Sequence, residues 1–250
     1  MIIKVEHLTK KYQDFIAINN LSFEVPKGII FGILGPNGAG KTTTLEIIET
    51  IKPKTSGKVF VDGFDLDKNS AAIKNIIGVQ LQSAGFYPNL NLIELIQLFS
   101  GLYNVKTNSM EVLSWVQLEK KAKAKYKELS GGQKQRFSVA TTIIHKPKIV
   151  FLDEPTTGLD PHARRNLWEL ILGLKNKGIT VVLTTHYMEE AEYLCDQLIV
   201  MDHGEKIAEG SPEELIDNLV QQGFKYQAKP RLATLEDVFI DLTGKSLREA

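Results

Sequence analysis

A glycine-rich stretch, "GPNGAGKTT", stands between an apolar run and a segment of helical periodicity. A cluster of glycines marks a place where the main chain must approach another group closely. The stretch fits the pattern G-x-x-x-x-G-K-[ST], in which inward-turned N–H groups and a helix N-terminus cradle phosphate oxygens. In this pattern the lysine meets the outer phosphates and the hydroxyl after it is a ligand of Mg²⁺. The sequence therefore predicts a nucleoside triphosphate site formed by Gly35, Pro36, Asn37, Gly38, Ala39, Gly40, Lys41, Thr42 and Thr43.

Two acidic residues follow a second apolar run, in "IVFLDEP". Asp153 comes at the end of a predicted buried strand, where its carboxylate can hold Mg²⁺ through water. Glu154, next to it, can orient and deprotonate an attacking water. Alone, such a pair is more typical of a solvated loop, and it is the upstream phosphate loop that favours a role in hydrolysis.

A third feature, "LSGGQKQRF", predicts a helix that begins after Ser130 as its N-cap. The first turns carry Lys134 and Arg136 and no acid, which is the opposite of what the helix dipole favours. Two glycines and surplus positive charge at a helix start suit an anion. Because the chain already has one phosphate cradle, this second site must find phosphates of its own or share those of a neighbour.

The elements that must position these residues alternate between strand and helix. Apolar runs at 28–35, 148–155 and 179–186 predict buried strands of a parallel sheet, and helical periodicity follows them. In one such helix Asp160 is a predicted N-cap, Pro161 takes the first helical position and Gly178 follows the end. The stretch "QLIVMDHGEKIAEG" predicts two strands around a His-Gly turn.

Two further regions differ from this alternation. The N-terminal stretch and "SGKVFVDG" predict short β segments and a hairpin, whereas residues 84–128 show helical periodicity without strand candidates. After Gly210 come the capping sequence "SPEEL", a polar linker and a predicted amphipathic helix at 234–245. We therefore expect an α/β chain with an antiparallel β subdomain and an α-helical insert.

The composition sets limits on function. Among 250 residues, 30 basic and 30 acidic side chains cancel, so no net positive field exists to hold nucleic acid. The one cysteine, Cys195, excludes an internal disulfide framework and a multi-cysteine zinc site, and we expect it to be buried filler. No secretory signal opens the sequence and no apolar run approaches the roughly 20 residues that span a bilayer.

The motifs together resemble a known family, the nucleotide-binding subunits of ABC transporters. "GPNGAGKTT" resembles the Walker A loop, "IVFLDE" the Walker B strand and "LSGGQ" the signature motif. "GLD" at 158–160 resembles the D-loop, and His186 in "TTH" the switch histidine. Gln82 is similar to the Q-loop glutamine, with Gln80 as a rival, and Tyr12 resembles the aromatic residue on which adenine stacks, with Phe15 as a rival.

The resemblance covers roughly residues 1–215 and implies a P-loop NTPase (RecA-like) core. It divides the chain into an ATP-binding core with the N-terminal β subdomain (1–82 and 146–210), a helical subdomain with the signature motif (83–145) and a short helical tail (211–250). It also implies a homodimer on nucleotide, in which Ser130, Gly131, Gly132 and Gln133 of one copy close over the γ-phosphate held by the other. Asp160 then serves at the interface. Glu154, His186 and Gln82 are the implied catalytic residues, and Thr42, Gln82 and Asp153 the implied magnesium ligands.

Within the family, the C-terminal third resembles the ATPases of drug, antibiotic and lipid exporters, whose membrane domain is a separate chain. The implied partners are ATP, Mg²⁺ and an integral membrane permease, with the chain at the cytoplasmic side of the membrane. Phe86, Tyr87 and Pro88 either line a docking groove for that permease or fill the core of the helical insert.

Two other functions remain open at this point. One is an ABC-type ATPase that acts on nucleic acid or ribosomes, although the long coiled coil or second cassette typical of those relatives is absent from this sequence. The other is a switch that binds ATP without turnover. Glu154, His186 and an intact "LSGGQ" argue against a switch.

Overall fold

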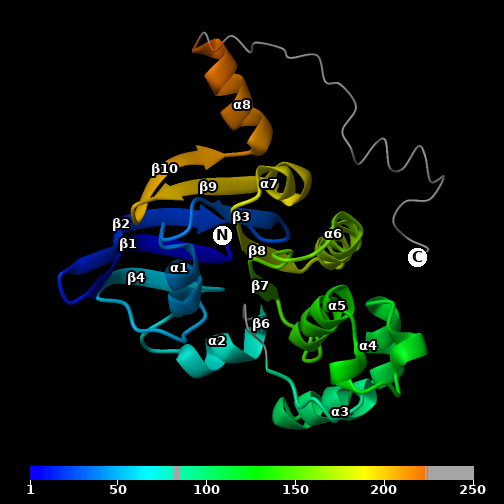
Figure 1. Cartoon of the computed structure of the whole chain (residues 1–250). Coiled ribbons are helices and arrows are strands. Elements are labelled where there is room, and N and C mark those ends of the chain that lie inside the picture. The colour runs from blue at the N-terminus through cyan, green and yellow to red at the C-terminus, as the bar shows by residue number, and fades with distance from the viewer. Residues whose placement is uncertain (81–84, 223, 225–250) are drawn as a thin grey trace, which may run out of the picture.

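Two β-sheets and their covering helices make up the part of the chain that the computed structural model describes, residues 1–80, 85–222 and 224. One sheet has the strand order β2-β1-β4-β5 and the other the order β10-β9-β3-β8-β7-β6. Figure 1 shows the helices α3, α4 and α5 grouped on the side away from β1, β2 and β4. The strands are β1 (Ile3–Tyr12), β2 (Phe15–Val25), β3 (Ile30–Leu34), β4 (Ser56–Val61), β5 (Phe64–Asp65), β6 (Ile77–Gln80), β7 (Ile149–Asp153), β8 (Thr180–Thr185), β9 (Gln197–Asp202) and β10 (Glu205–Gly210).

The helices confirm the expected alternation. They are α1 (Lys41–Ile48), α2 (Ser70–Ile76), α3 (Leu92–Leu102), α4 (Ser109–Trp115), α5 (Gly131–Thr142), α6 (Pro161–Asn176), α7 (Met188–Leu194) and α8 (Pro212–Gln221). Among the described residues no helix is both long enough and apolar enough to cross a membrane.

The six-stranded sheet carries the candidate site. Its strands β3, β6, β7, β8 and β9 are parallel, and β10 pairs antiparallel with β9. Every residue of β3, β7 and β8 is buried, as their continuous apolar runs predict for strands covered on both faces. Parallel strands end at the same edge of a sheet, so the residues that follow β3, β7 and β8 meet there.

Helix α1 lies between the two sheets. Its residues Leu45, Ile47 and Ile48 belong to one buried cluster with apolar residues of β1 and β3. The four-stranded sheet is antiparallel, as predicted, and β4 and β5 form the expected hairpin. This packing fixes the phosphate loop, because the loop is the connection between β3 and α1.

The caps of α6 confirm the sequence prediction. The Asp160 carboxylate accepts a hydrogen bond from the Ala163 N–H at 2.8 Å, Pro161 stands at the first helical position, and Gly178 follows the helix with φ of 78°. The capping box of α8, between Ser211 and Glu214, is also present. The predicted helix at 234–245 lies outside the described residues.

The helical region has its own aromatic core. Phe86 packs against Tyr126 and Phe137, with ring centroids 4.8 and 5.3 Å apart, and it also contacts Phe99. By contrast, Tyr87 is 65% exposed. The sequence leaves two roles open for residues 86–88, a docking groove for the permease or the core of the insert. Phe86 fills the core of the insert, whereas Tyr87 and Pro88 are exposed at the surface.

Candidate functional site

The phosphate loop, residues 35–40, needs glycine for two different reasons. At Gly38 the backbone φ is +84°, a left-handed conformation that favours glycine. At Gly35 and Gly40 a Cβ would lie 2.2 Å from the Met201 carbonyl oxygen and 2.6 Å from the Ala17 carbonyl oxygen, so there is no room for one. The helix that follows has no side-chain cap on its first N–H groups and no acid in its first turn, which leaves these donors for an anion.

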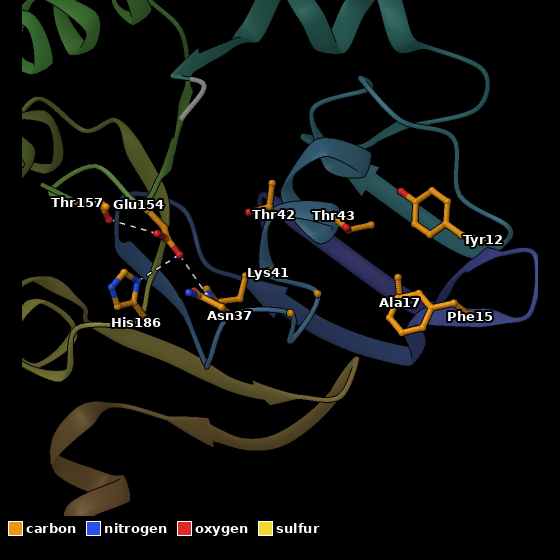
Figure 2. A pocket seen from close by; sticks show the side chains of 12 residues that line it. Tyr12, Phe15, Ala17, Asn37, Lys41, Thr42, Thr43, Glu154, Thr157 and His186 are labelled. Carbon is orange, nitrogen blue, oxygen red and sulfur yellow. Dashed lines mark hydrogen bonds and ion pairs between the residues drawn. The ribbon is translucent and has the colours of Figure 1, made fainter. Parts of the chain in front are cut away.

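Lys41 lies folded into the loop. Only 4% of its side chain is exposed, and its Nζ donates hydrogen bonds to the carbonyl oxygens of Gly35 (2.9 Å) and Pro36 (3.0 Å). The same Nζ is 3.5 Å from Oε1 of Glu154, a contact drawn in Figure 2. The ammonium group therefore has partners that a phosphate can replace, and it already faces the acid predicted to activate water.

Two of the three predicted metal ligands, Thr42 and Asp153, lie in contact. The Thr42 hydroxyl is 3.1 and 3.0 Å from the two carboxylate oxygens of Asp153, and the hydroxyl of Thr184 on β8 also donates to Asp153. Asp153 itself is only 6% exposed. Within the described residues, no group of three or more His, Cys, Asp or Glu side chains could hold a metal ion.

Glu154 has an unusual backbone conformation. Its φ of +46° is rare for a residue with a side chain, and its N–H donates to Thr184 Oγ1 at 3.0 Å. The carboxylate accepts a hydrogen bond from the Thr157 hydroxyl (3.2 Å), and its other oxygen is 3.3 Å from Nδ1 of His186. In this conformation the side chain points toward Lys41 and His186 (Figure 2).

These side chains share one cavity of about 650 Å³. In Figure 2, Tyr12 and Phe15 lie at one end of it and Glu154 and His186 at the other, with the loop lysine between them. Both aromatic rings line the cavity, so both are placed to stack on a base. One face of the Tyr12 ring is covered by Lys10, whose Nζ lies 4.8 Å from the ring centroid. The full lining is Tyr12, Phe15, Ala17, Asn37, Gly38, Gly40, Lys41, Thr42, Thr43, Glu154, Thr157 and His186.

The signature residues line a different cavity. Ser130 is the N-cap of α5 and forms a capping box with Gln133, and α5 has no acid in its first turn, as predicted. Ser130, Gly131, Gly132, Gln133 and Asp160 are among the residues around a hollow of about 430 Å³. A single chain therefore brings the phosphate loop, Glu154 and His186 together and keeps the signature residues apart from them.

Gln82 and Gln80 are the two candidates for the Q-loop glutamine. Gln82 lies outside the described residues. Gln80, in β6, is 2% exposed, and its Oε1 has no hydrogen-bond partner in the described part of the chain. Gln80 is not among the side chains that line the large cavity.

Several residues near the site had no motif to reveal them. Ala17 and Thr157 line the large cavity, and Thr184 holds both Asp153 and the N–H of Glu154. Burial, and then the negative charges of Asp153 and Glu46, raise the pKa of Glu49 to about 8.

Cys195 is buried, as predicted, and burial raises the pKa of its thiol far above the usual range. A thiol that holds its proton this firmly is a weak nucleophile. The residue packs beside Gly32 of β3, where a Cβ would lie 2.7 Å from the cysteine sulfur.

Comparison with known proteins agrees with this geometry. A family model described as ABC transporter matches residues 18–157. The chain is 33% identical to the Nod factor export ATP-binding protein I of Cupriavidus metallidurans, over 99% of both chains. It is 38% identical to the linearmycin resistance ATP-binding protein LnrL of Bacillus subtilis, over 87% of this chain and 72% of the other.

Solved structures give the same result. An ATP-binding cassette of an ABC transporter in its ADP conformation is 27% identical and superposes with a TM-score of 0.78, over 88% of this chain and 94% of the other. A dimeric post-hydrolysis cassette bound to ADP and phosphate is 28% identical, with a TM-score of 0.75 over 84% and 98% of the two chains. The chain therefore belongs to the ABC transporter family, as an ATP-binding subunit that hydrolyses ATP.

Proposed function

We propose that this chain powers an exporter: two copies close on ATP, hydrolyse it and thereby move a separate membrane subunit. The main support for ATP hydrolysis in this proposal is that Lys41, Glu154 and His186 lie close together in one cavity. Glu154 Oε1 lies 3.5 Å from Lys41 Nζ and 3.3 Å from His186 Nδ1. A carboxylate so placed, beside a phosphate loop, suits the activation of water.

The nucleotide lies along the cavity in this proposal. Residues 35–43 surround the phosphates, and Lys41 exchanges its carbonyl partners for the outer phosphate oxygens. Adenine stacks on Tyr12 at the far end, with Phe15 beside it. The order of these side chains along the cavity in Figure 2 supports this direction of binding.

Thr42 and Asp153 would hold Mg²⁺. Their hydroxyl and carboxylate oxygens lie 3.0 and 3.1 Å apart, and hard oxygen donors of this kind are what Mg²⁺ prefers. The ion keeps several waters and takes phosphate oxygens as further ligands, so it does not need a cluster of three protein acids. Bound there, it would neutralise charge on the outer phosphates. Gln82 belongs to the same proposed site.

In the reaction, Glu154 accepts the proton of a water that attacks the γ-phosphorus, and the bond from that phosphorus to the oxygen shared with the β-phosphate breaks, which releases ADP and phosphate. His186 contacts the γ-phosphate and the water, while Lys41 offsets the negative charge that develops on the outer phosphate oxygens. The Thr157 hydroxyl, 3.2 Å from the second carboxylate oxygen, keeps Glu154 aimed at the cavity.

The second copy completes the site. A separate cavity, which no residue of the phosphate loop lines, is lined by Ser130, Gly131, Gly132, Gln133 and Asp160. A head-to-tail pair brings this acid-free helix start over the γ-phosphate of the other copy. A dimeric bacterial ABC transporter cassette is among the similar structures, at 28% identity and a TM-score of 0.75, and it supports the formation of a dimer.

Export through a membrane partner rests on the relatives and on the surface. Relatives at 33 to 42% identity are named for Nod factor export and for linearmycin resistance. Tyr87, Leu98 and Leu102 are exposed apolar side chains of the helical subdomain, which we place at residues 83–145, and they offer a contact surface for the permease. The chain would then lie at the cytoplasmic side of the membrane, with residues 1–82 and 146–210 as the ATP-binding core and 211–250 as a tail.

Phosphate release by a Glu154→Gln variant tests the catalytic proposal. The amide keeps the shape of the side chain but cannot accept the proton, so we expect release to fall by about 100-fold or more, with ATP binding retained. Glu192→Gln, an exposed change on α7, is the matched control. Unchanged turnover in Glu154→Gln would remove Glu154 from the mechanism.

Two results would favour the other functions. An ATP-bound chain that never releases phosphate would indicate a switch. Purification from membranes that recovers no integral membrane protein, together with recovery of ribosomes, would indicate the nucleic-acid class.

A further inference from the structure

Helix α6 and the segment 187–194 are joined by side-chain contacts that neither the phosphate loop nor the signature helix uses. Two residues of α6, Arg164 and Trp168, contact two residues of that segment, Tyr187 and Glu190. These four residues are here named the α6–α7 contact. The pairs are Trp168 with Glu190 and Arg164 with Tyr187. In each pair the first residue comes after Asp160 in the chain and the second comes after His186.

The inner half of the α6–α7 contact is a buried hydrogen bond. The indole Nε1–H of Trp168 donates to Oε1 of Glu190 at 3.0 Å, and the two residues are 3% and 0% exposed. The other carboxylate oxygen, Oε2, has no hydrogen-bond partner in the described part of the chain. A buried carboxylate with one partner is costly, so the residue serves something other than packing alone.

The outer half is a stack at the surface. The Arg164 guanidinium lies 4.9 Å from the centre of the Tyr187 ring, and its Nη1 is 3.8 Å from Glu189. The indole of Trp168 stacks on the ring of Tyr193 with centroids 4.9 Å apart. The two elements are thus held at both the buried and the exposed edge of their interface.

These contacts complete a continuous path of chain segments and side-chain contacts that begins and ends at the Glu154 carboxylate. From Glu154 the chain runs through residues 155–159 to Asp160, the N-cap of α6. The contact Trp168–Glu190 joins α6 to α7, and one residue, Tyr187, separates His186 from the start of α7. The last contact of this path is between His186 Nδ1 and Glu154 Oε1, which lie 3.3 Å apart.

We propose that Trp168 and Glu190 are positioning residues, which hold His186 against Glu154 and make its place depend on the N-terminus of α6. The inference rests on the proposed roles of Glu154 and His186. Whatever draws His186 toward a γ-phosphate then also pulls on Asp160, at the surface that meets the second copy. Hydrolysis in one copy and the dimer interface are thereby linked through two side chains that touch neither nucleotide nor partner.

Trp168→Phe tests the proposal with the smallest change. Phenylalanine keeps a ring against Tyr193 and removes the donor to Glu190, together with part of the buried ring volume. We expect kcat for ATP to fall by about 10- to 100-fold, because a displaced His186 no longer meets the reacting groups, while KM stays within about threefold. A purely structural role predicts a lower melting temperature with kcat unchanged below it.

Glu190→Gln is the conservative partner of that variant. The amide oxygen can accept the same indole hydrogen bond, so we expect kcat to stay within about threefold of the wild-type value. Tyr193→Phe, which removes only the exposed hydrogen bond from its hydroxyl to Glu169 (2.9 Å), is the matched control and should leave kcat and KM unchanged.

A third variant keeps the test decisive if Trp168→Phe does not fold. Arg164→Gln removes the outer stack without opening the core and should lower kcat more than KM. Wild-type kcat in folded Trp168→Phe, or in Arg164→Gln where Trp168→Phe does not fold, overturns the inference. Loss of turnover in Glu154→Gln alongside that result leaves the proposed function intact, so the two failures are distinguishable.

Discussion

His186 Nδ1 lies 3.3 Å from Oε1 of Glu154, and this contact joins the residues that directly follow β7 and β8. The two strands are neighbours in the sheet, and the pair lies where parallel strands expose their carboxyl ends. Lys41, the first residue of α1 after the phosphate loop, lies 3.5 Å from the same oxygen. One carboxylate oxygen of the residue after β7 therefore contacts side chains from the segments that follow β8 and β3, the next two strands in the sheet order.

Removal of the imidazole should affect catalysis more than binding. For His186→Ala we expect kcat to fall by about 100- to 1,000-fold, the effect of losing one preorganised contact to the reacting groups, with ATP affinity within about threefold. His203→Ala is the control, because that side chain is 95% exposed and does not line the cavity. Single-turnover phosphate release and equilibrium ATP binding separate the two effects. A His186→Ala variant that binds ATP tenfold more weakly and turns over normally once saturated would contradict the account.

Stacking of adenine distinguishes Tyr12 from Phe15. Both rings line the cavity, at 41% and 64% exposure. We expect Tyr12→Ala to weaken ATP binding by about 10-fold, in line with about 1–3 kcal/mol for stacking one base on an aromatic ring. Phe15→Ala should have a smaller effect. Affinity for inorganic tripolyphosphate, which has no base, should be the same in both variants and in the wild type. The reverse order of the two variants would assign the stack to Phe15.

Stability should depend on pH through Glu49. Burial, with the charges of Asp153 and Glu46, raises its pKa to about 8 from the ordinary value of 4.5. The folded state therefore holds a proton that the unfolded chain releases. The stability that this proton contributes is complete below pH 4.5 and is lost as the pH rises through 8.

Glu49→Gln mimics the protonated side chain and should remove this dependence. Compared with the wild type, the variant should gain on the order of 1–4 kcal/mol in the free energy of unfolding between pH 5 and pH 8. Urea unfolding without nucleotide or magnesium measures it, and Glu192→Gln on the surface is the control. An equal effect of Glu49→Gln at both pH values would show that Glu49 is ionised in the folded chain.

The sequence predicts the frame of the site well, because that frame depends on local signals. The apolar runs mark β3, β7 and β8, and Asp160, Pro161 and Gly178 mark the ends of α6. Parallel strands then force Lys41, Glu154 and His186 to one edge of the sheet. Family membership, the P-loop fold and ATP hydrolysis were all predicted from these motifs and are confirmed by the comparisons.

The remaining features depend on contacts between distant segments, which the sequence pattern does not encode. Glu154 has a φ of +46°, and its N–H donates to the hydroxyl of Thr184, thirty residues further along the chain. The burial of Glu49 and Glu190 could not be predicted, because an acidic residue in a helix is ordinarily exposed. Phe86 lies in the core of the insert because it packs against Tyr126 and Phe137, whereas its neighbour Tyr87 is exposed, and the sequence pattern does not distinguish the two.

The central claim is that two copies complete one another's ATP site, and the mass of the ATP-bound species tests it most directly. In Glu154→Gln, which should bind ATP without releasing it, sedimentation should show a dimer with ATP and a monomer without it. Adding Ser130→Arg should abolish the dimer, whereas adding Ser114→Arg, an exposed change on α4, should not. A dimer that survives Ser130→Arg, with turnover intact in the single Ser130→Arg chain, would contradict the account.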